Sequence, residues 1–456
     1  MNATDYLVSF LGNLTWNDLP KEVKRKTKTC LLDALGAAIA GSNSRSGEIV
    51  SDFAMRSWGK GDATVIMKGR TAPVGAALAN GYMANALDID DGGKYTRGHP
   101  GAQIIPTVLA LGESQSSSGK EVLAAIAAGY ETSHRVGRCW HERFDEYRSC
   151  GSWGSIACAA ASANLIGLEG EEIRNALGIA DYNSPYLPMM RAVENPSMVK
   201  HGTGWGAMTG IIAAEWAEEG FTASGTSFET EDCNTWFKNL GSHYVMGEED
   251  GVEFKEIPSC SWSHPPIKAA LGLLDAHDIG KEEIGRMEVR GFSEMTALPQ
   301  EIPTSEEEAQ FNVKWPLAVA LVDGEVSISG MSEERFGDPE LRAMAERIEI
   351  VKSEKMEKLN RSLSREEGET SAWPAEVIIE TVDDRTFESG IVTSEPGRVA
   401  SLENIAEKFD RMVDPFLEKE EKERVSELVK EFGTVARISD FTYLLAGESS
   451  HPEVVE

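Results

Sequence analysis

The sequence predicts a mainly α protein, with a large all-helical domain at residues 1–265 and 395–456 and a smaller α+β domain at 266–394. Ala- and Gly-rich segments with helical spacing of apolar residues dominate the first 265 residues. After residue 266 the pattern changes to Val- and Ile-rich alternation, which is typical of strands. A chain of 456 residues also exceeds what one compact core usually holds, so more than one domain is expected.

The helical region begins with a predicted helix over KEVKRKTKTCLLDALGAAIAG, capped by Asn17 or Asp18. Four further segments are built largely from Ala and Gly, namely 75–87, 121–137, 155–168 and 204–220. Small side chains let helices approach closely, and helices that are apolar around most of their surface are usually buried in a larger assembly. This part of the sequence therefore predicts a packed helical domain and an oligomer.

The smaller domain is predicted to begin with a helix over 267–280. It continues with strands at 286–292, 347–353 and 375–384 and a helix at 308–324. The charged segment 353–373 is interpreted as an exposed loop. The stretch 401–432 again has a helical pattern and is expected to return to the helical domain.

The formal net charge of −31 and a sequence pI near 4.7 bear on the partners of this protein. Nucleic acid is excluded as the main partner because a phosphate backbone requires a basic surface, and anionic membranes are disfavoured for the same reason. Such a charge serves solubility. An acidic small-molecule substrate would need a local positive pocket, so clustered basic residues are informative in this chain.

Six cysteines lie far apart without a CxxC pair, which argues against a disulfide framework and favours a reducing compartment. The first residues, MNATDYLVSF, lack the basic stretch and apolar run of a signal peptide. The longest apolar stretches are too short to span a bilayer. We therefore expect a cytoplasmic protein with no membrane association.

The segment LDIDDGGKYTRGHPG at 87–101 carries the densest group of polar residues, including Asp88, Asp91, Arg97 and His99. Carboxylates, a histidine and a cation together can bind a polar substrate and move protons. The alternative is a solvated loop whose aspartates cap the following helix.

Three further segments hold candidate binding groups. Arg148 precedes a Gly- and Ser-containing helix start and has the geometry to clamp a carboxylate, although an ordinary turn is the alternative. Lys200 and His201 open a glycine-rich helix without any phosphate-loop pattern, and a surface pair is the alternative. Lys255 and Cys260 lie at the junction of the two domains, where ligand sites are common.

No cofactor or metal is predicted. The chain lacks a GxGxxG after a strand and a Walker motif. Cys260 and His264 are four residues apart, but a single pair supplies only half of a metal site.

In combination, these segments resemble the MmgE/PrpD family over almost the whole chain. The segments that carry the resemblance are DALGAAIAGS (33–42), NGYMANALDIDD (80–91), GHPGAQIIPTVLALGE (98–113), AGYETSHRVG (128–137), CGSWGSIACAAASANLIGL (150–168), MVKHGTGWGAMTGIIAAEWAEEGFT (198–222) and FKEIPSCSWSH (254–264). The family includes 2-methylcitrate dehydratase, cis-aconitate decarboxylase and iminodisuccinate epimerase. The resemblance implies a large helical domain with a smaller α+β lid, usually in a homodimer.

The resemblance also implies site residues. Asp88, His99, Lys200 and Lys255 match positions that line the active site of the decarboxylase. Arg148 and Cys260 stand where the decarboxylase has histidines, and Trp315 stands where it has a tyrosine. These departures change which groups can act as acid and base.

We therefore predict a cofactor-independent lyase, a dehydratase that acts on a small 2-hydroxy di- or tricarboxylate by removing a proton alpha to a carboxylate. The predicted catalytic residues are Asp88, His99, Lys200 and Cys260, and the predicted substrate-binding residues are Asp91, Arg97, Arg148, His201, Lys255 and Trp315. An epimerase or racemase of a dicarboxylate, a cis-aconitate-type decarboxylase and a non-catalytic family member remain as alternatives.

Overall fold

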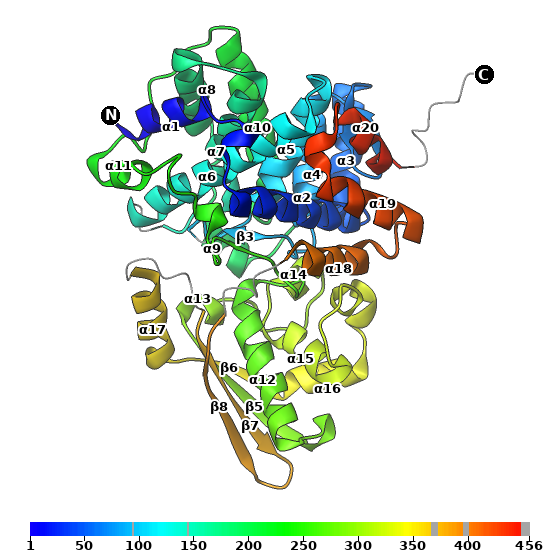
Figure 1. Cartoon of the computed structure of the whole chain (residues 1–456). Helices are drawn as coiled ribbons and strands as arrows, with labels where there is room; N and C mark the ends of the chain where they lie inside the picture. Colours follow the sequence, from blue (N-terminus) through cyan, green and yellow to red (C-terminus); the bar gives the residue numbers. More distant parts are fainter. Residues whose placement is uncertain (94, 144–145, 366–372, 395–400, 448–456) are drawn as a thin grey trace, which may run out of the picture.

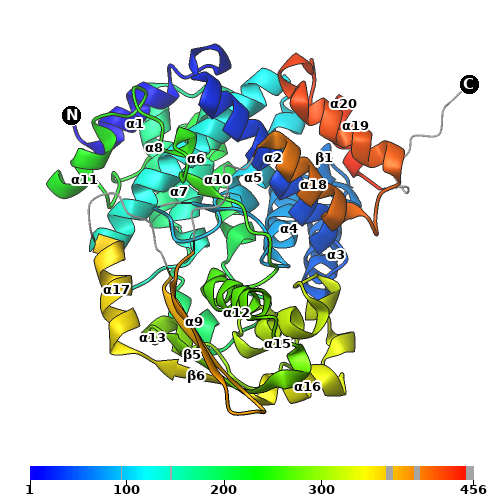
Figure 2. The ribbon, with the colours of Figure 1, turned by 60° about the horizontal axis from the view of Figure 1, so that its bottom comes forward.

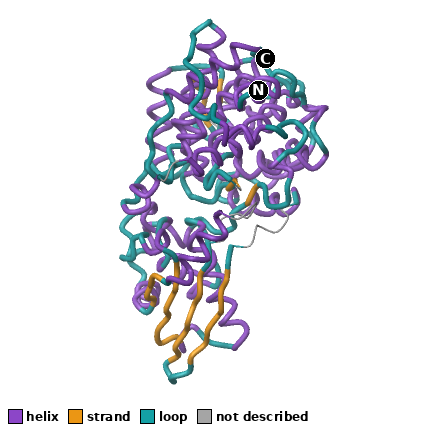
Figure 3. Tube along the Cα trace, turned by 90° about the vertical axis from the view of Figure 1, so that its left-hand side faces the viewer, coloured by secondary structure: helices purple, strands orange, loops and turns teal. Residues whose placement is uncertain are grey.

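A computed structural model describes residues 1–93, 95–143, 146–365, 373–394 and 401–447. It confirms the mainly α class, because helices fill the larger part of the molecule and the longer strands form one small sheet (Figure 1). In Figure 3 the strands of that sheet lie together at the end of the molecule opposite the N-terminus.

The larger part contains most of the helices. These are α1 (Ala3–Leu11), α2 (Lys21–Gly41), α3 (Arg45–Trp58), α4 (Pro73–Asn85), α5 (Gly101–Ser114), α6 (Gly119–Arg143), α7 (Cys150–Ile166), α8 (Gly170–Tyr182), α10 (Thr203–Glu218), α11 (Glu231–Phe237), α18 (Leu402–Val413), α19 (Lys419–Lys430) and α20 (Ser439–Thr442). The first long helix begins at Lys21 after Pro20, so the predicted cap at Asn17 or Asp18 is wrong. Those two residues lie in a short 3-10 turn that precedes it.

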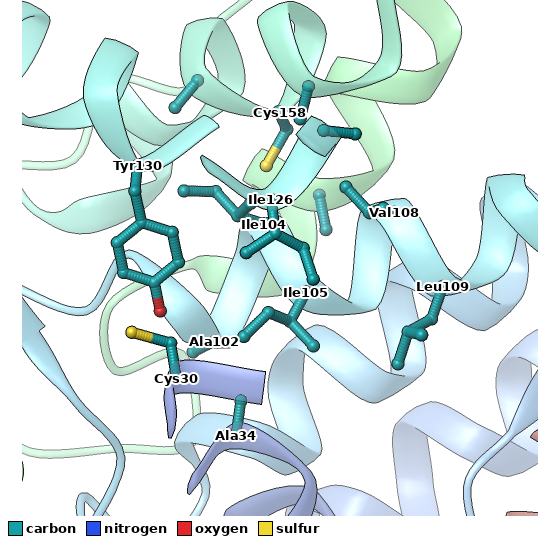
Figure 4. Close-up of a cluster of buried hydrophobic side chains, with 14 of the residues drawn as sticks. Cys30, Ala34, Ala102, Ile104, Ile105, Val108, Leu109, Ile126, Tyr130 and Cys158 are labelled. Carbon is teal, nitrogen blue, oxygen red and sulfur yellow. The ribbon is translucent and has the colours of Figure 1, made fainter. Parts of the chain in front are cut away.

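Branched side chains of α5 lie at the centre of the helical core, between α2 and α6, with α7 close by (Figure 4). Figure 4 shows Ile104 and Ile105 of α5 near Ile126 of α6 and Ala34 of α2. The Ala- and Gly-rich composition allows this density, since small residues let the helix axes come close. Each of these residues is at most 2% exposed.

Helix α18 packs on α2, and the Lys408–Asp33 contact between them joins residues 375 positions apart in the chain (Figure 2). Lys408 of α18 is buried and forms an ion pair of 2.5 Å with Asp33 of α2. Its ammonium group also donates to the carbonyl oxygen of Ile89 at 2.7 Å. A buried lysine needs such partners because an unpaired buried charge is costly, and this one ties α18 to the loop that follows α4.

The smaller part is built around a four-stranded sheet with the order β6-β5-β7-β8. The strands are β5 (Ile284–Gly291), β6 (Ile348–Lys352), β7 (Ala375–Thr381) and β8 (Thr386–Val392). The β5–β6 pair is parallel and the other two pairs are antiparallel. The associated helices are α9 (Met189–Glu194), α12 (His264–His277), α13 (Ser293–Thr296), α14 (Glu306–Gln310), α15 (Lys314–Asp323), α16 (Pro339–Glu346) and α17 (Glu354–Arg365).

The structure corrects three element predictions in this part. Residues 354–365 form a helix rather than a loop, and residues 366–372 lie outside the described part. The predicted helix at 308–324 is divided into α14 and α15, because Asn312 leaves helical geometry and accepts a hydrogen bond from the backbone of Trp315 at 2.9 Å. The edge strand β8 was missed, since apolar and polar residues do not alternate regularly in its sequence TFESGIV, which also contains Gly390.

The apolar residues form two separate clusters, one for each part of the molecule. The predicted domain boundaries remain a prediction, and the second, between 394 and 395, adjoins residues outside the described part. All six cysteines are free thiols. Among the described residues, no helix has both the length and the apolarity that crossing a membrane requires.

Candidate active site

A cavity of about 840 Å³, which includes the space that opens to solvent, is lined by residues from both parts of the molecule. The larger part contributes Asp88, Arg97, His99 and His201. The connecting segment contributes Lys255, Cys260 and Trp262, and the far side is formed by Trp373 and Ser394. The paired strands β3 (Gly92–Gly93) and β4 (Val252–Glu253) hold the polar loop against the connecting segment.

Asp88 lies at the centre of the polar wall. Its Oδ1 atom is 3.3 Å from Nε2 of His99 and 3.8 Å from Nε2 of His201, and its Oδ2 atom is 3.1 Å from Nζ of Lys255. Burial acts to raise the pKa of Asp88, but the charges of Lys255 and its other basic neighbours outweigh burial and lower it. Asp88 is therefore ionised at neutral pH and is a weak base.

His99 is held from both sides of its ring. Its Nδ1 atom lies 3.0 Å from Oδ2 of Asp90, and the other oxygen of Asp90 accepts a hydrogen bond of 3.0 Å from Asn85. Burial acts to lower the pKa of His99, but Asp90 and Asp88 together raise it above 6.5. A carboxylate behind Nδ1 fixes the ring orientation and strengthens Nε2 as a base.

His201 lies beside His99, with a distance of 4.4 Å between the ring centroids. Its Nδ1 atom is 3.3 Å from the hydroxyl of Ser149. Burial, together with the charge that His99 carries when it is protonated, lowers the pKa of His201 well below 6.5. The ring is therefore neutral at physiological pH and is suited to hydrogen bonding.

Three residues around the cavity have left-handed backbone angles, with φ of 52° at Asp88, 49° at Arg97 and 38° at Lys200. Such angles are uncommon outside glycine and cluster at functional sites, where surrounding contacts compensate the strain. Two of the three residues line the cavity.

Asp88, His99 and His201 could hold a metal ion, because one donor atom of each lies within 4.8 Å of the others. Lys255 is 3.1 Å from the second oxygen of Asp88, so a cation there would meet a neighbouring positive charge. The absence of a metal from the reaction remains a prediction.

Five residues predicted from the sequence as site residues line the cavity together with Asp88, namely Arg97, His99, His201, Lys255 and Cys260. Burial raises the pKa of Cys260 to about 12, so this group is a thiol at neutral pH. Lys94, which belongs to the same polar loop, lies outside the described residues.

Two predicted residues have structural partners away from the cavity wall. The ammonium group of Lys200 donates to the carbonyl oxygens of Asn85 at 2.7 Å and Ala86 at 3.1 Å, at the C-terminus of α4. Asp91 accepts hydrogen bonds from the hydroxyl of Tyr130 at 2.6 Å and from the backbone of Gly101 at 2.9 Å, at the start of α5. Asp91 is thus a helix cap, the alternative that the sequence left open.

Two further predicted residues also lie outside the described cavity wall. The guanidinium group of Arg148 lies over the rings of Trp140 and Tyr186, at 4.4 and 4.8 Å from their centroids. Trp315 is packed inside the smaller part, and its indole nitrogen donates to the carbonyl oxygen of Gly330 at 3.3 Å.

Several residues around the site were not singled out from the sequence. Asp90 lies between two other aspartates, and no sequence signal tells which of the three supports His99. Tyr147, Glu253, Trp262 and Trp373 also line the cavity. Trp373 is the last residue of the charged segment 353–373, which gave no indication of a site. Glu253 is two residues before Lys255, and that spacing could have drawn attention to it.

These features define a helical protein with a buried two-histidine, aspartate and lysine site beside an α+β part. The MmgE/PrpD N-terminal domain model matches residues 5–243, and the MmgE/PrpD C-terminal domain model matches residues 257–433. The chain belongs to the MmgE/PrpD family.

Similar proteins include cis-aconitate decarboxylases. The protein from Aspergillus terreus is 24% identical, with 91% of this chain and 95% of that protein covered. The human protein is 23% identical, with 99% and 96% covered. The cis-aconitate decarboxylase-like protein oryM of Aspergillus oryzae is 23% identical, with 98% of both chains covered. Family members and these relatives are enzymes, and the relatives' names point to a carboxylate substrate.

Proposed function

We propose that this chain is a cofactor-independent lyase that removes water from a small 2-hydroxy di- or tricarboxylate. The observation that supports this most is His99, whose ring is fixed by Asp90 at 3.0 Å and which lines the cavity together with Lys255 and Arg97. A base next to two cations is the arrangement needed to remove a proton alpha to a carboxylate.

Each group has a distinct task in this reaction. Nε2 of His99 accepts the alpha proton. Lys255 and Arg97 bind carboxylate oxygens and stabilise the negative charge that develops as the carbon–hydrogen bond breaks. Asp88 is ionised, keeps Lys255 in place at 3.1 Å and orients the two histidines.

Decarboxylation is a second candidate, which the names of the relatives favour. An epimerase that uses Cys260 as its second base is less well supported. Such an enzyme needs a thiolate in one reaction direction, and the thiol pKa of about 12 opposes that state.

We further propose that the protein acts in the cytoplasm. The six free cysteine thiols support this location, because a reducing compartment keeps thiols unpaired.

The test is a proton-NMR assay in heavy water on a panel of citrate-like, malate-like and amino-dicarboxylate compounds. We expect a new vinylic signal for a hydroxy acid, and a fall of at least ~10²-fold in this rate for His99→Gln, with unchanged thermal unfolding. His277→Gln is the control, because His277 is exposed at the end of α12 and does not line the cavity. Release of carbon dioxide without water loss would favour decarboxylation.

The same assay separates the remaining alternatives. Deuterium incorporation with inversion and no net elimination would favour an epimerase. If no compound of the panel reacts or exchanges, the proposed lyase activity is contradicted and a non-catalytic role is favoured.

A further inference from the structure

Glu253 is a carboxyl group in the cavity that has no role in the mechanism so far. It ends strand β4, where it pairs with Gly92 of β3, and it lies two residues before Lys255. A side-chain carbon built at Gly92 would lie 3.9 Å from Oε2 of Glu253, so this carboxyl group lies over the loop that leads to His99. Glu253 therefore shares the cavity with the base and the carboxylate-binding lysine.

The carboxyl group of Glu253 makes no ion pair or hydrogen bond with any of the described residues, in contrast to Asp88. The side chain is half-buried at the cavity wall. Burial raises the pKa of Glu253, and the nearby charges of Lys255 and His99 only partly oppose this. Among the described residues, the carboxyl groups of Asp88, Asp250 and Glu253 line this cavity. That of Asp88 is kept ionised, and that of Glu253 is shifted toward its protonated form.

Elimination of water from a hydroxy acid needs an acid as well as a base. Hydroxide is a poor leaving group unless a proton reaches its oxygen as the carbon–oxygen bond breaks. A carboxyl group that burial shifts toward its protonated form can supply that proton, while a separate group in the same cavity acts as the base. Cys260 could also give a proton, but its thiol pKa of about 12 makes it a weak acid.

We propose that Glu253 is a catalytic acid that protonates the leaving hydroxyl group while His99 accepts the alpha proton. The electron pair of the broken carbon–hydrogen bond forms the carbon–carbon double bond. The carbon–oxygen bond breaks, and the oxygen leaves as water with the proton of Glu253. His99 ends protonated and Glu253 ionised, and exchange with solvent restores both groups. This inference rests on the proposed lyase function and assigns its leaving group.

The first test separates proton removal from water loss with Glu253→Gln. We expect elimination from the hydroxy acid identified in the panel to fall by at least ~10²-fold, while exchange of the alpha proton for deuterium continues. Glu249→Gln is the matched control, because Glu249 lies four residues earlier, is exposed and does not line the cavity. It should keep the parental elimination rate.

The second test uses a leaving group that needs no proton. For malate as the hydroxy acid, the probe is 2-chlorosuccinate, from which chloride leaves unaided. Glu253→Gln should release chloride at a rate within a few-fold of the parent chain and should still fail on malate. This pattern would also show that the variant is folded and keeps its base.

Specific results would overturn the inference. An acid role for Glu253 is contradicted if the Glu253→Gln variant eliminates water at the parental rate. It is also contradicted if the variant loses chloride release and deuterium exchange to the same extent as it loses water elimination. Failure of the parent chain on every compound would instead overturn the proposed lyase function and this inference with it.

Discussion

At the scale of single residues, the site depends on which aspartate faces which basic group. The sequence DIDD offers three aspartates within four positions, and the structure gives each a different partner. Asp88 faces Lys255 and the Nε2 atoms of the two histidines, Asp90 supports His99 from behind, and Asp91 caps α5. Since the backbone turns sharply at Asp88, with φ of 52°, neighbouring side chains diverge.

The role of Asp90 can be tested through the pH dependence of the reaction. His99 accepts a proton only when it is neutral, so activity should rise with pH through the raised pKa of His99, above 6.5. Asp90→Asn removes the charge that contributes most to raising this pKa. The acidic limb of kcat/KM against pH should therefore move to lower pH, with a lower plateau because the base is weaker.

The measurement is the pH profile of the parent and the variant, each shown to be folded by thermal unfolding. If Asp90→Asn keeps the acidic limb where the parent has it, Asp90 does not set the protonation of His99.

At the scale of elements, glycine determines how closely α7 and α10 approach. A side-chain carbon at Gly210 of α10 would lie 2.2 Å from the Cβ atom of Cys158 and 2.6 Å from its carbonyl carbon, on α7. Gly206 has a similar constraint, because a carbon there would lie 2.2 Å from the side-chain oxygen of Gln103. The Ala- and Gly-rich composition is thus a packing requirement for α7 and for α10, which begins two residues after His201.

Gly210→Ala should lower the free energy of unfolding by about 1–3 kcal/mol, because the backbone of α7 must move to accept the methyl group. Gly272→Ala on α12 is the matched control, since no atom lies within 4 Å of the added carbon. That variant should gain about 0.5–1 kcal/mol from helix propensity. Urea unfolding of both variants checks this, and equal effects of the same sign would contradict the packing argument.

At the scale of the whole molecule, a chain with a net charge of −31 still exposes large apolar side chains near the start and along one side of α10. Val199 is 61% exposed, Trp205 50% and Trp216 46%. Exposed apolar groups that gather on one helix mark an interaction surface. We propose that this surface joins two copies of the chain in a homodimer.

The double variant Trp205→Glu/Trp216→Glu should shift the mass measured by light scattering from that of a dimer toward 49.6 kDa. New negative charges on an apolar contact carry a desolvation cost and repel their symmetry mates. Phe53→Glu is the control, because Phe53 is similarly exposed, at 44%, but lies on α3. A parent chain that is monomeric at micromolar concentration, or a double variant that stays dimeric, would contradict this interface.

The sequence by itself determined the mainly α class, the change to a mixed fold after residue 266 and the loop at 87–101 as the centre of the site. These features are local, because helical and strand periodicity and a dense group of polar residues can be read within short windows. Strand β8 and helix α17 were not predicted from the sequence. An exposed edge strand and a charged helix bury too few apolar residues to show the strand or helix periodicity of apolar positions.

Only the tertiary structure decided which of the candidate residues meet. It brought His201, Lys255 and Cys260 to the cavity from distant segments, and it directed Lys200, Arg148 and Trp315 to other partners. It also placed Asp90 behind His99 and Glu253 in the cavity. The direction of a side chain follows from the local backbone angle and from contacts hundreds of residues away, and neither is encoded in the spacing of a motif.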